Sequence, residues 1–165
     1  MSENGGESPL LVFGTVALDT IQAPSGERKG LLGGSGSYAA LSAARFGPVR
    51  LVSAVGEDFP GKDLGFLRRA GVDLEGVVVR PGRRSMRWTG RYSEDLSTRE
   101  TVRVDLDVFE GLVLEVPAPW RDSRLVLLAN GSPRDQLRVL DALRDGAFAV
   151  ADTMNLWIGT ERPSL

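Results

Sequence analysis

Two stretches of the 165-residue chain could bind a ligand. Asp19 is expected just beyond the carboxyl end of a strand at 10–14, and its two carboxylate oxygens can accept hydrogen bonds from two neighbouring hydroxyls of a sugar. Residues 33–36 (Gly-Gly-Ser-Gly) lead into a helix, whose free N–H groups and positive dipole end favour oxygen-rich or anionic ligands. Each feature alone also has an ordinary explanation: a solvated turn aspartate, and a glycine turn that only permits close packing.

The chain contains no histidine and no cysteine. This excludes thiol nucleophiles, histidine-based triads and the usual zinc sites. A general base would have to be a carboxylate, and a metal would have to be a hard cation held by oxygen. Without cysteine there is no disulfide framework, and the first nine residues are too polar for a signal peptide, so we expect a cytoplasmic protein.

The composition is that of a soluble globular protein with one core, because 42% of the residues are hydrophobic and 25% are charged. The net charge of -2 gives no reason to expect nucleic acid or an anionic membrane as a partner. No apolar run approaches the roughly 18 residues that would span a bilayer.

Apolar runs alternate with helical segments along most of the chain, which predicts an α/β body with a mostly parallel sheet. Strands are expected at 10–14, 49–56, 125–130 and 147–151. Helices are expected from Gly34 to Gly47, from about 60 to 70 with Asp58 as cap, and from Ser132 to Gly146. No further helix is expected before the last residue. Asn130 and Asp152 fall at strand tips, where ligands collect in open α/β sheets.

Between residues 76 and 109 the pattern changes to an alternation of apolar and charged residues. A period of two is typical of antiparallel strands with one wet face, so we expect a small sheet attached to the body. Its apolar face needs a cover, which could be a ligand, the body or another subunit. We interpret Trp88 and Tyr92 as packing residues of this sheet rather than as stacking platforms.

Residues 34–39 match the G-x-G-x-x-G/A dinucleotide fingerprint, and carboxylates follow at Glu57 and Asp58. That fingerprint directly follows a buried strand, whereas a charged turn at 27–30 precedes it here. A Rossmann oxidoreductase that binds NAD is therefore the less favoured alternative.

Four stretches resemble the PfkB (ribokinase-like) family of sugar and nucleoside kinases. They are 13–19, 33–36 with the alanine-rich helix, 55–61 and 67–73. The resemblance extends from residue 10 to about 158 and implies a ribokinase-like α/β fold: a mostly parallel sheet with flanking helices plus a small antiparallel β lid. Residues 1–165 would form an incomplete domain without the C-terminal half, with a body at about 10–14, 34–73 and 112–158. The lid would comprise about 15–33 and 76–108.

In the intact family, the resemblance implies transfer of the γ-phosphoryl group of ATP, with Mg²⁺, to a hydroxyl of a sugar or nucleoside. The residues that it places at the substrate are Asp19, Gly33, Gly34, Ser35, Tyr38 and Asn130. It places Asp152 and Asn155 beside the path of the phosphoryl group. In the family the lid closes over the substrate and often serves as a dimer interface, which implies a possible homodimer.

Two departures limit what the resemblance implies. Ala17, Ser35 and Tyr38 stand where ribokinases have Asn, Lys and Asn, so the particular sugar or nucleoside stays open. The sequence also has no G-A-G-D motif, which in the family supplies the catalytic base and anion hole, and no N-x-x-E metal motif within residues 10–158, the region of the resemblance. We therefore expect the substrate-binding half of a kinase that is inactive as this fragment, without catalytic or metal-binding residues, and that binds neither ATP nor Mg²⁺ well. The alternative is a non-catalytic sugar-binding or dimerisation module.

Overall fold

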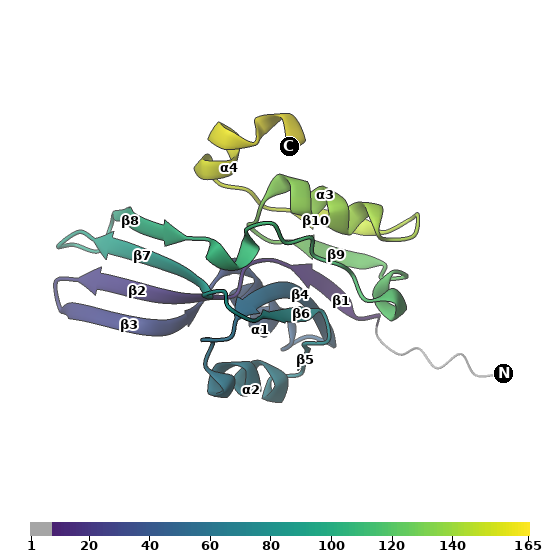
Figure 1. The fold of residues 1–165 in the computed structure, drawn as a ribbon, viewed down its shortest axis with the longest axis horizontal. Helices are drawn as coiled ribbons and strands as arrows, with labels where there is room; N and C mark the ends of the chain where they lie inside the picture. Colours follow the sequence, from purple (N-terminus) through teal and green to yellow (C-terminus); the bar gives the residue numbers. More distant parts are fainter. Residues whose placement is uncertain (1–7) are drawn as a thin grey trace.

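The computed structural model describes residues 8–165, so most of the polar start of the chain lies outside the described residues. Its larger sheet runs in the order β10-β9-β1-β4-β5, with β6 also paired to β4, and every pair in it is parallel (Figure 1). The strands are β1 (Leu10–Phe13), β4 (Val49–Gly56), β5 (Val72–Asp73), β6 (Val77–Arg80), β9 (Leu125–Leu128) and β10 (Phe148–Ala151). This sheet and its helices are called the body below, and they confirm the predicted α/β class.

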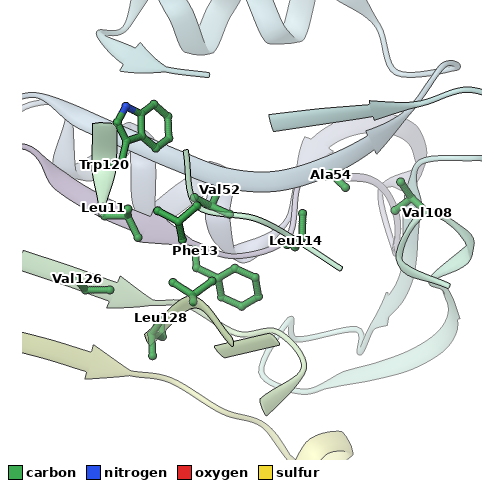
Figure 2. Packing of buried hydrophobic residues seen from close by; sticks show 11 residues of the cluster. Leu11, Phe13, Val52, Ala54, Val108, Leu114, Trp120, Val126 and Leu128 are labelled. Carbon is green, nitrogen blue, oxygen red and sulfur yellow. The ribbon is translucent and has the colours of Figure 1, made fainter. Parts of the chain in front are cut away.

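The central strands of the body are buried on both faces, which explains why their sequences read as continuous apolar runs. Along β1, Leu11 and Phe13 join one hydrophobic cluster while Val12 joins the other, because successive side chains point to opposite faces. Figure 2 shows the first cluster, in which Leu11 and Phe13 lie with Val52 and with residues of β9.

Helices cover both faces of the body sheet. The helices are α1 (Ser35–Ala43), α2 (Gly61–Arg69), α3 (Pro133–Asp141) and α4 (Asn155–Thr160). Ala40 of α1 and Leu67 of α2 belong to the cluster of Val12, whereas Val139 of α3 belongs to that of Leu11. No helix among residues 8–165 has the length and apolar character needed to cross a membrane.

Several helix boundaries differ from the prediction. Helix α1 ends at Ala43 and a turn leads to Gly47, and α3 likewise ends well before Gly146. The residue before α2 is Pro60 rather than Asp58, because the Asp58 side chain instead binds Ser85, just before β7, and Arg87 in β7. Helix α4 is absent from the prediction; it is short, and none of its residues is buried.

The smaller sheet, called the lid, runs in the order β3-β2-β7-β8 and extends to one side of the body (Figure 1). Its strands are β2 (Ala17–Ala23), β3 (Gly26–Gly33), β7 (Met86–Tyr92) and β8 (Arg99–Asp105). It consists of two antiparallel hairpins, β2–β3 and β7–β8, joined by a parallel pairing of β2 with β7.

Two expectations about the lid need correction. Residues 77–80, placed in it from their alternation, form β6 and pair with the second half of β4 in the body. Alternation predicts a strand but does not identify its neighbour. Asp19 does not sit at the tip of a body strand; it lies inside β2, opposite Leu31 on one side and Trp88 on the other.

Candidate functional site

A cavity of about 340 Å³ lies between the lid and the body. Its lid wall comes from β2, β7 and β8, and its body wall comes from the start of α1, from Asn130 shortly after β9 and from the start of α4. The predicted substrate residues among its lining are Asp19, Gly34, Ser35, Tyr38 and Asn130. The cavity thus brings together five residues that three separate parts of the chain supply.

Asp19 is the acidic side chain of the lid wall. Its Oδ1 atom is buried and has no hydrogen-bond partner among the described residues. Burial raises the pKa of this carboxyl from 3.8 to about 6, because a charged group loses solvation there. A buried acceptor without a hydrogen bond lowers the stability of the fold. A ligand hydroxyl that donated a hydrogen bond to it would remove this cost.

Gly33 and Gly34 lack side chains where the Asp19 carboxylate and the Thr15 backbone come close to the chain. A Cβ atom on Gly33 would overlap the carboxylate of Asp19, so any larger residue would displace it. Gly34 has φ of +92°, and a Cβ there would meet the carbonyl oxygen of Thr15. The double glycine therefore allows the chain to turn from β3 into α1 directly beside Asp19.

The start of α1 is bonded to the end of β1 through Thr15. The Gly36 N–H donates to the Thr15 carbonyl at 2.9 Å, and the Ser35 N–H donates to Thr15 Oγ1 at 3.1 Å. Ser35 Oγ in turn donates to the carbonyl of Asn130 at 2.6 Å. These bonds use N–H groups that the sequence led us to expect free for a ligand, so this helix start is chiefly a fixed wall.

Aromatic side chains form much of the remaining wall, with Trp88 and Tyr92 on the lid and Trp157 on α4. The Trp157 Nε1–H donates to Asn130 Oδ1 at 2.8 Å, which fixes the indole relative to the body. The guanidinium of Arg99 lies 5.2 Å from the ring centre of Trp88. Trp88 and Tyr92 are therefore not only packing residues of the lid sheet, because both also face the cavity.

A sequence signal for Trp88 exists in Gly90, two residues further along β7. A Cβ atom on Gly90 would overlap the indole of Trp88, so the glycine makes room for a large ring on the same face. No comparable signal marks Trp157 or Met154, since both follow the last body strand in a segment whose sequence predicts no helix or strand.

The two residues predicted beside the phosphoryl path do not line the cavity. The side chain of Asp152 is exposed, and its backbone N–H and carbonyl bond to Leu128 and Gln136. Asn155 is exposed as the first residue of α4. Among residues 8–165 no three acidic, histidine or cysteine side chains gather where they could hold a metal ion.

The chain is similar in sequence and in fold to known kinases. The chain is 32% identical over 136 residues to a cytidine kinase of Thermococcus kodakarensis, a match that covers 82% of the chain and 48% of that relative. A search against protein-family models found no match.

Solved structures of kinases share the fold. A nucleoside kinase of Methanocaldococcus jannaschii, an archaeal member of the ribokinase family, aligns over 98% of this chain and 56% of its own, with a TM-score of 0.73 and 17% identity. The nucleoside kinase of Burkholderia thailandensis in complex with inosine aligns over 87% and 52%, with a TM-score of 0.71 and 16% identity. The ribokinase of Cryptococcus neoformans in complex with ADP aligns over 88% and 49%, with a TM-score of 0.67 and 21% identity.

The chain belongs to the PfkB (ribokinase-like) kinase family. It spans about half the length of the curated relative that it matches.

Proposed function

We propose that the chain is the substrate-binding half of a nucleoside kinase, and that Asp19 accepts hydrogen bonds from the sugar hydroxyls of a nucleoside. The observation that carries this proposal is the Asp19 carboxylate: the residue lines a ligand-sized cavity, and its buried Oδ1 has no partner among the described residues. A carboxylate there orients a diol and holds the hydroxyl that would receive the phosphoryl group.

The choice of a nucleoside over a simple sugar rests on the aromatic wall. Trp88 and Tyr92 on the lid and Trp157 on α4 offer flat apolar surfaces that suit a nucleobase, which stacks on aromatic rings. A free pentose offers only a small patch of C–H groups to such a wall, whereas a nucleobase offers a whole planar ring. The similarity to a cytidine kinase and to nucleoside kinases supports the same choice.

Within this proposal, the chain binds and orients the acceptor and excludes water around it. ATP and Mg²⁺ supply the phosphoryl group and neutralise its charge in such a reaction. We assign neither to residues 8–165, because no metal-binding cluster forms among them and the sequence has no G-A-G-D stretch. We therefore propose that these residues alone do not transfer phosphoryl groups.

Calorimetric titration of the chain with cytidine, inosine and ribose tests the substrate. We expect cytidine or inosine to bind more tightly than ribose. Asp19→Asn should weaken nucleoside binding by about tenfold or more, because hydrogen bonds to a charged group contribute roughly 1.5–3 kcal/mol. Asp141→Asn, at the exposed end of α3, is the control and should bind like the parent.

Equal affinity of the parent and Asp19→Asn would remove Asp19 from the site. Ribose bound as tightly as the nucleosides would contradict the role of the aromatic wall. A separate assay of ADP release with ATP, Mg²⁺ and cytidine tests the inactivity of the isolated chain, which release above background would refute.

A further inference from the structure

The substrate cavity has one wall on the lid and one on the body, so its width depends on how the lid is held. The chain passes between body and lid four times: after β1, after β3, after β6 and after β8. The first two passages meet at Thr15 and Gly36, which share a backbone hydrogen bond of 2.9 Å. The other two passages are held mainly by side chains.

Asp58 connects the end of body strand β4 to the beginning of lid strand β7. Its Oδ1 accepts hydrogen bonds from both the N–H and the Oγ–H of Ser85, each at 2.7 Å. Its Oδ2 lies 2.8 Å from Nη2 of Arg87. Ser85 Oγ also accepts from the N–H of Gly56, the last residue of β4, at 3.0 Å. One carboxylate thus engages three groups of the segment that enters the lid.

These contacts lie directly behind the cavity wall. Arg87 stands between Met86 and Trp88 in β7, and both of these neighbours line the cavity. Arg87 is paired in register with Leu18, and Trp88 is paired with Asp19. A shift of β7 relative to β4 would therefore carry Trp88 and Asp19 away from the body wall together.

A second group of charged residues connects the segment after β8, where the chain returns to the body, with the segment just before β7. Asp107, just after β8, accepts from the Arg84 N–H and pairs with Arg83 at 2.8 Å. Arg83 and Arg84 directly precede Ser85, so the two passages on this side are tied to each other. Asp58, together with the bond from the Gly56 N–H to Ser85 Oγ, ties them to the end of β4.

We propose that Asp58 is a positioning residue, which sets the angle of the lid to the body and hence the width of the nucleoside cavity. As far as it concerns a nucleoside, the proposal rests on the function proposed above. The side chain of Asp58 is 30% exposed and lies outside both hydrophobic clusters, so its contacts to the lid are its main structural role.

The lid angle can be measured without any ligand. The chain has no cysteine, so Ser25→Cys in the turn between lid strands β2 and β3 and Lys62→Cys on α2 provide two unique exposed sites for spin labels. Pulsed electron resonance then gives the distribution of distances between them. We expect a narrow distribution in the doubly labelled parent and a broader or shifted one after Asp58→Ala.

Asp95→Ala is the matched control, because Asp95 also accepts from a serine N–H and from serine hydroxyls, but within the β7–β8 turn. It should leave the distance distribution unchanged. Asp58→Asn keeps an acceptor for Ser85 and loses the charge facing Arg87, so it should give an intermediate distribution and serves if Asp58→Ala does not fold. A distribution identical to that of the parent in every folded Asp58 variant would overturn the proposal.

Titration with cytidine extends the test to the site. Asp58→Ala should weaken cytidine binding by about tenfold, because part of the population then holds the lid too far from the body. Asp95→Ala should bind like the parent. Weakened binding without a change in lid distance would contradict the proposal. If the parent itself bound no nucleoside, the proposed function would fail, while the distance measurement would still decide the role of Asp58.

Discussion

Strand β4 of the body and strand β7 of the lid are both bonded to neighbours on two sides, yet their side chains meet very different surroundings. In β4 every residue except Arg50 is buried, whereas in β7 only Gly90 is. The edge strands of the lid are more open still, since β8 has no buried residue and β3 has only Gly33. The body is therefore held mainly by apolar burial. The lid, apart from Ala17 and Leu18 at the start of β2, is held by its backbone ladder and a few charged contacts.

This difference suits a site with one fixed and one adjustable wall. The body wall is bonded through Thr15, Ser35 and Asn130 to strands whose displacement would open the core. The lid wall carries Asp19 and Trp88 on a sheet whose movement exposes little apolar surface, so its displacement costs less free energy. Each of the following changes tests the contrast between body and lid.

A pair of leucines provides the largest contrast. Leu51 in β4 is fully buried, whereas Leu31 in β3 is 38% exposed. Leu51→Ala should lower the free energy of unfolding by about 2–5 kcal/mol, because it leaves a cavity in the core. Leu31→Ala should lower it by less than about 1 kcal/mol. Urea denaturation of both variants measures this, and similar losses would show that the lid is packed as tightly as the body.

Two glycines with positive φ give the next contrast. Gly34 has φ of +92° and touches Thr15, whereas Gly30 in β3 has φ of +66°, and a Cβ atom there would meet no other group within 4 Å. Gly34→Ala should cost about 2–3 kcal/mol from strain and steric overlap together, and Gly30→Ala should cost about 1 kcal/mol from strain alone. Thermal and urea unfolding of the two variants would check the order, and an equal loss would contradict the close approach at Gly34.

Asp19 should make stability depend on pH. Its folded pKa of about 6 exceeds its ordinary value of 3.8, so between these values the folded chain holds more protons than the unfolded chain. The free energy of unfolding should therefore fall as pH rises from about 4 to about 6. Asp19→Asn removes this loss, and we expect it to stabilise the chain by about 1–2 kcal/mol at pH 8 and hardly at all at pH 4.

Urea unfolding at the two pH values measures the difference, with Asp141→Asn on the surface as the control. An unchanged pH dependence in Asp19→Asn would mean that the carboxylate is well solvated. The same pKa also predicts that nucleoside binding weakens below pH 6, since a protonated Asp19 accepts hydrogen bonds poorly.

Most of the body could be predicted from the sequence. The run 49–56 matches β4 residue for residue, because burial on both faces leaves a continuous apolar stretch bounded by Pro48 and Glu57. Strands β9 and β10 and the helix between them followed from the same alternation. Helix ends were less certain, because α1 stops where its alanines end rather than at Gly47.

The lid and the cavity walls were harder to predict, because they depend on contacts between distant segments. Residues 77–80 read as a lid strand, but their partner is β4, which only the folded chain reveals. Asp58 is interpreted from the sequence as a helix cap, because the residues next to it do not reveal that its side chain binds Ser85 and Arg87. Asp19 and Gly34 could be named in advance, whereas Trp157 faces the cavity only because α4 folds back over Asn130.

The smallest contrast comes from two arginines that lie over tryptophans. Arg50 lies 5.6 Å from the ring centre of the buried Trp120 in the body, and Arg99 lies 5.2 Å from that of Trp88 in the lid. Such pairs contribute more where they are desolvated, so Arg50→Met should lower the free energy of unfolding by about 1 kcal/mol and Arg99→Met by about half of that. Urea denaturation measures both losses. A larger loss for Arg99→Met would mean that the lid, despite its exposure, is fixed by its aromatic contacts rather than by the charges at its base.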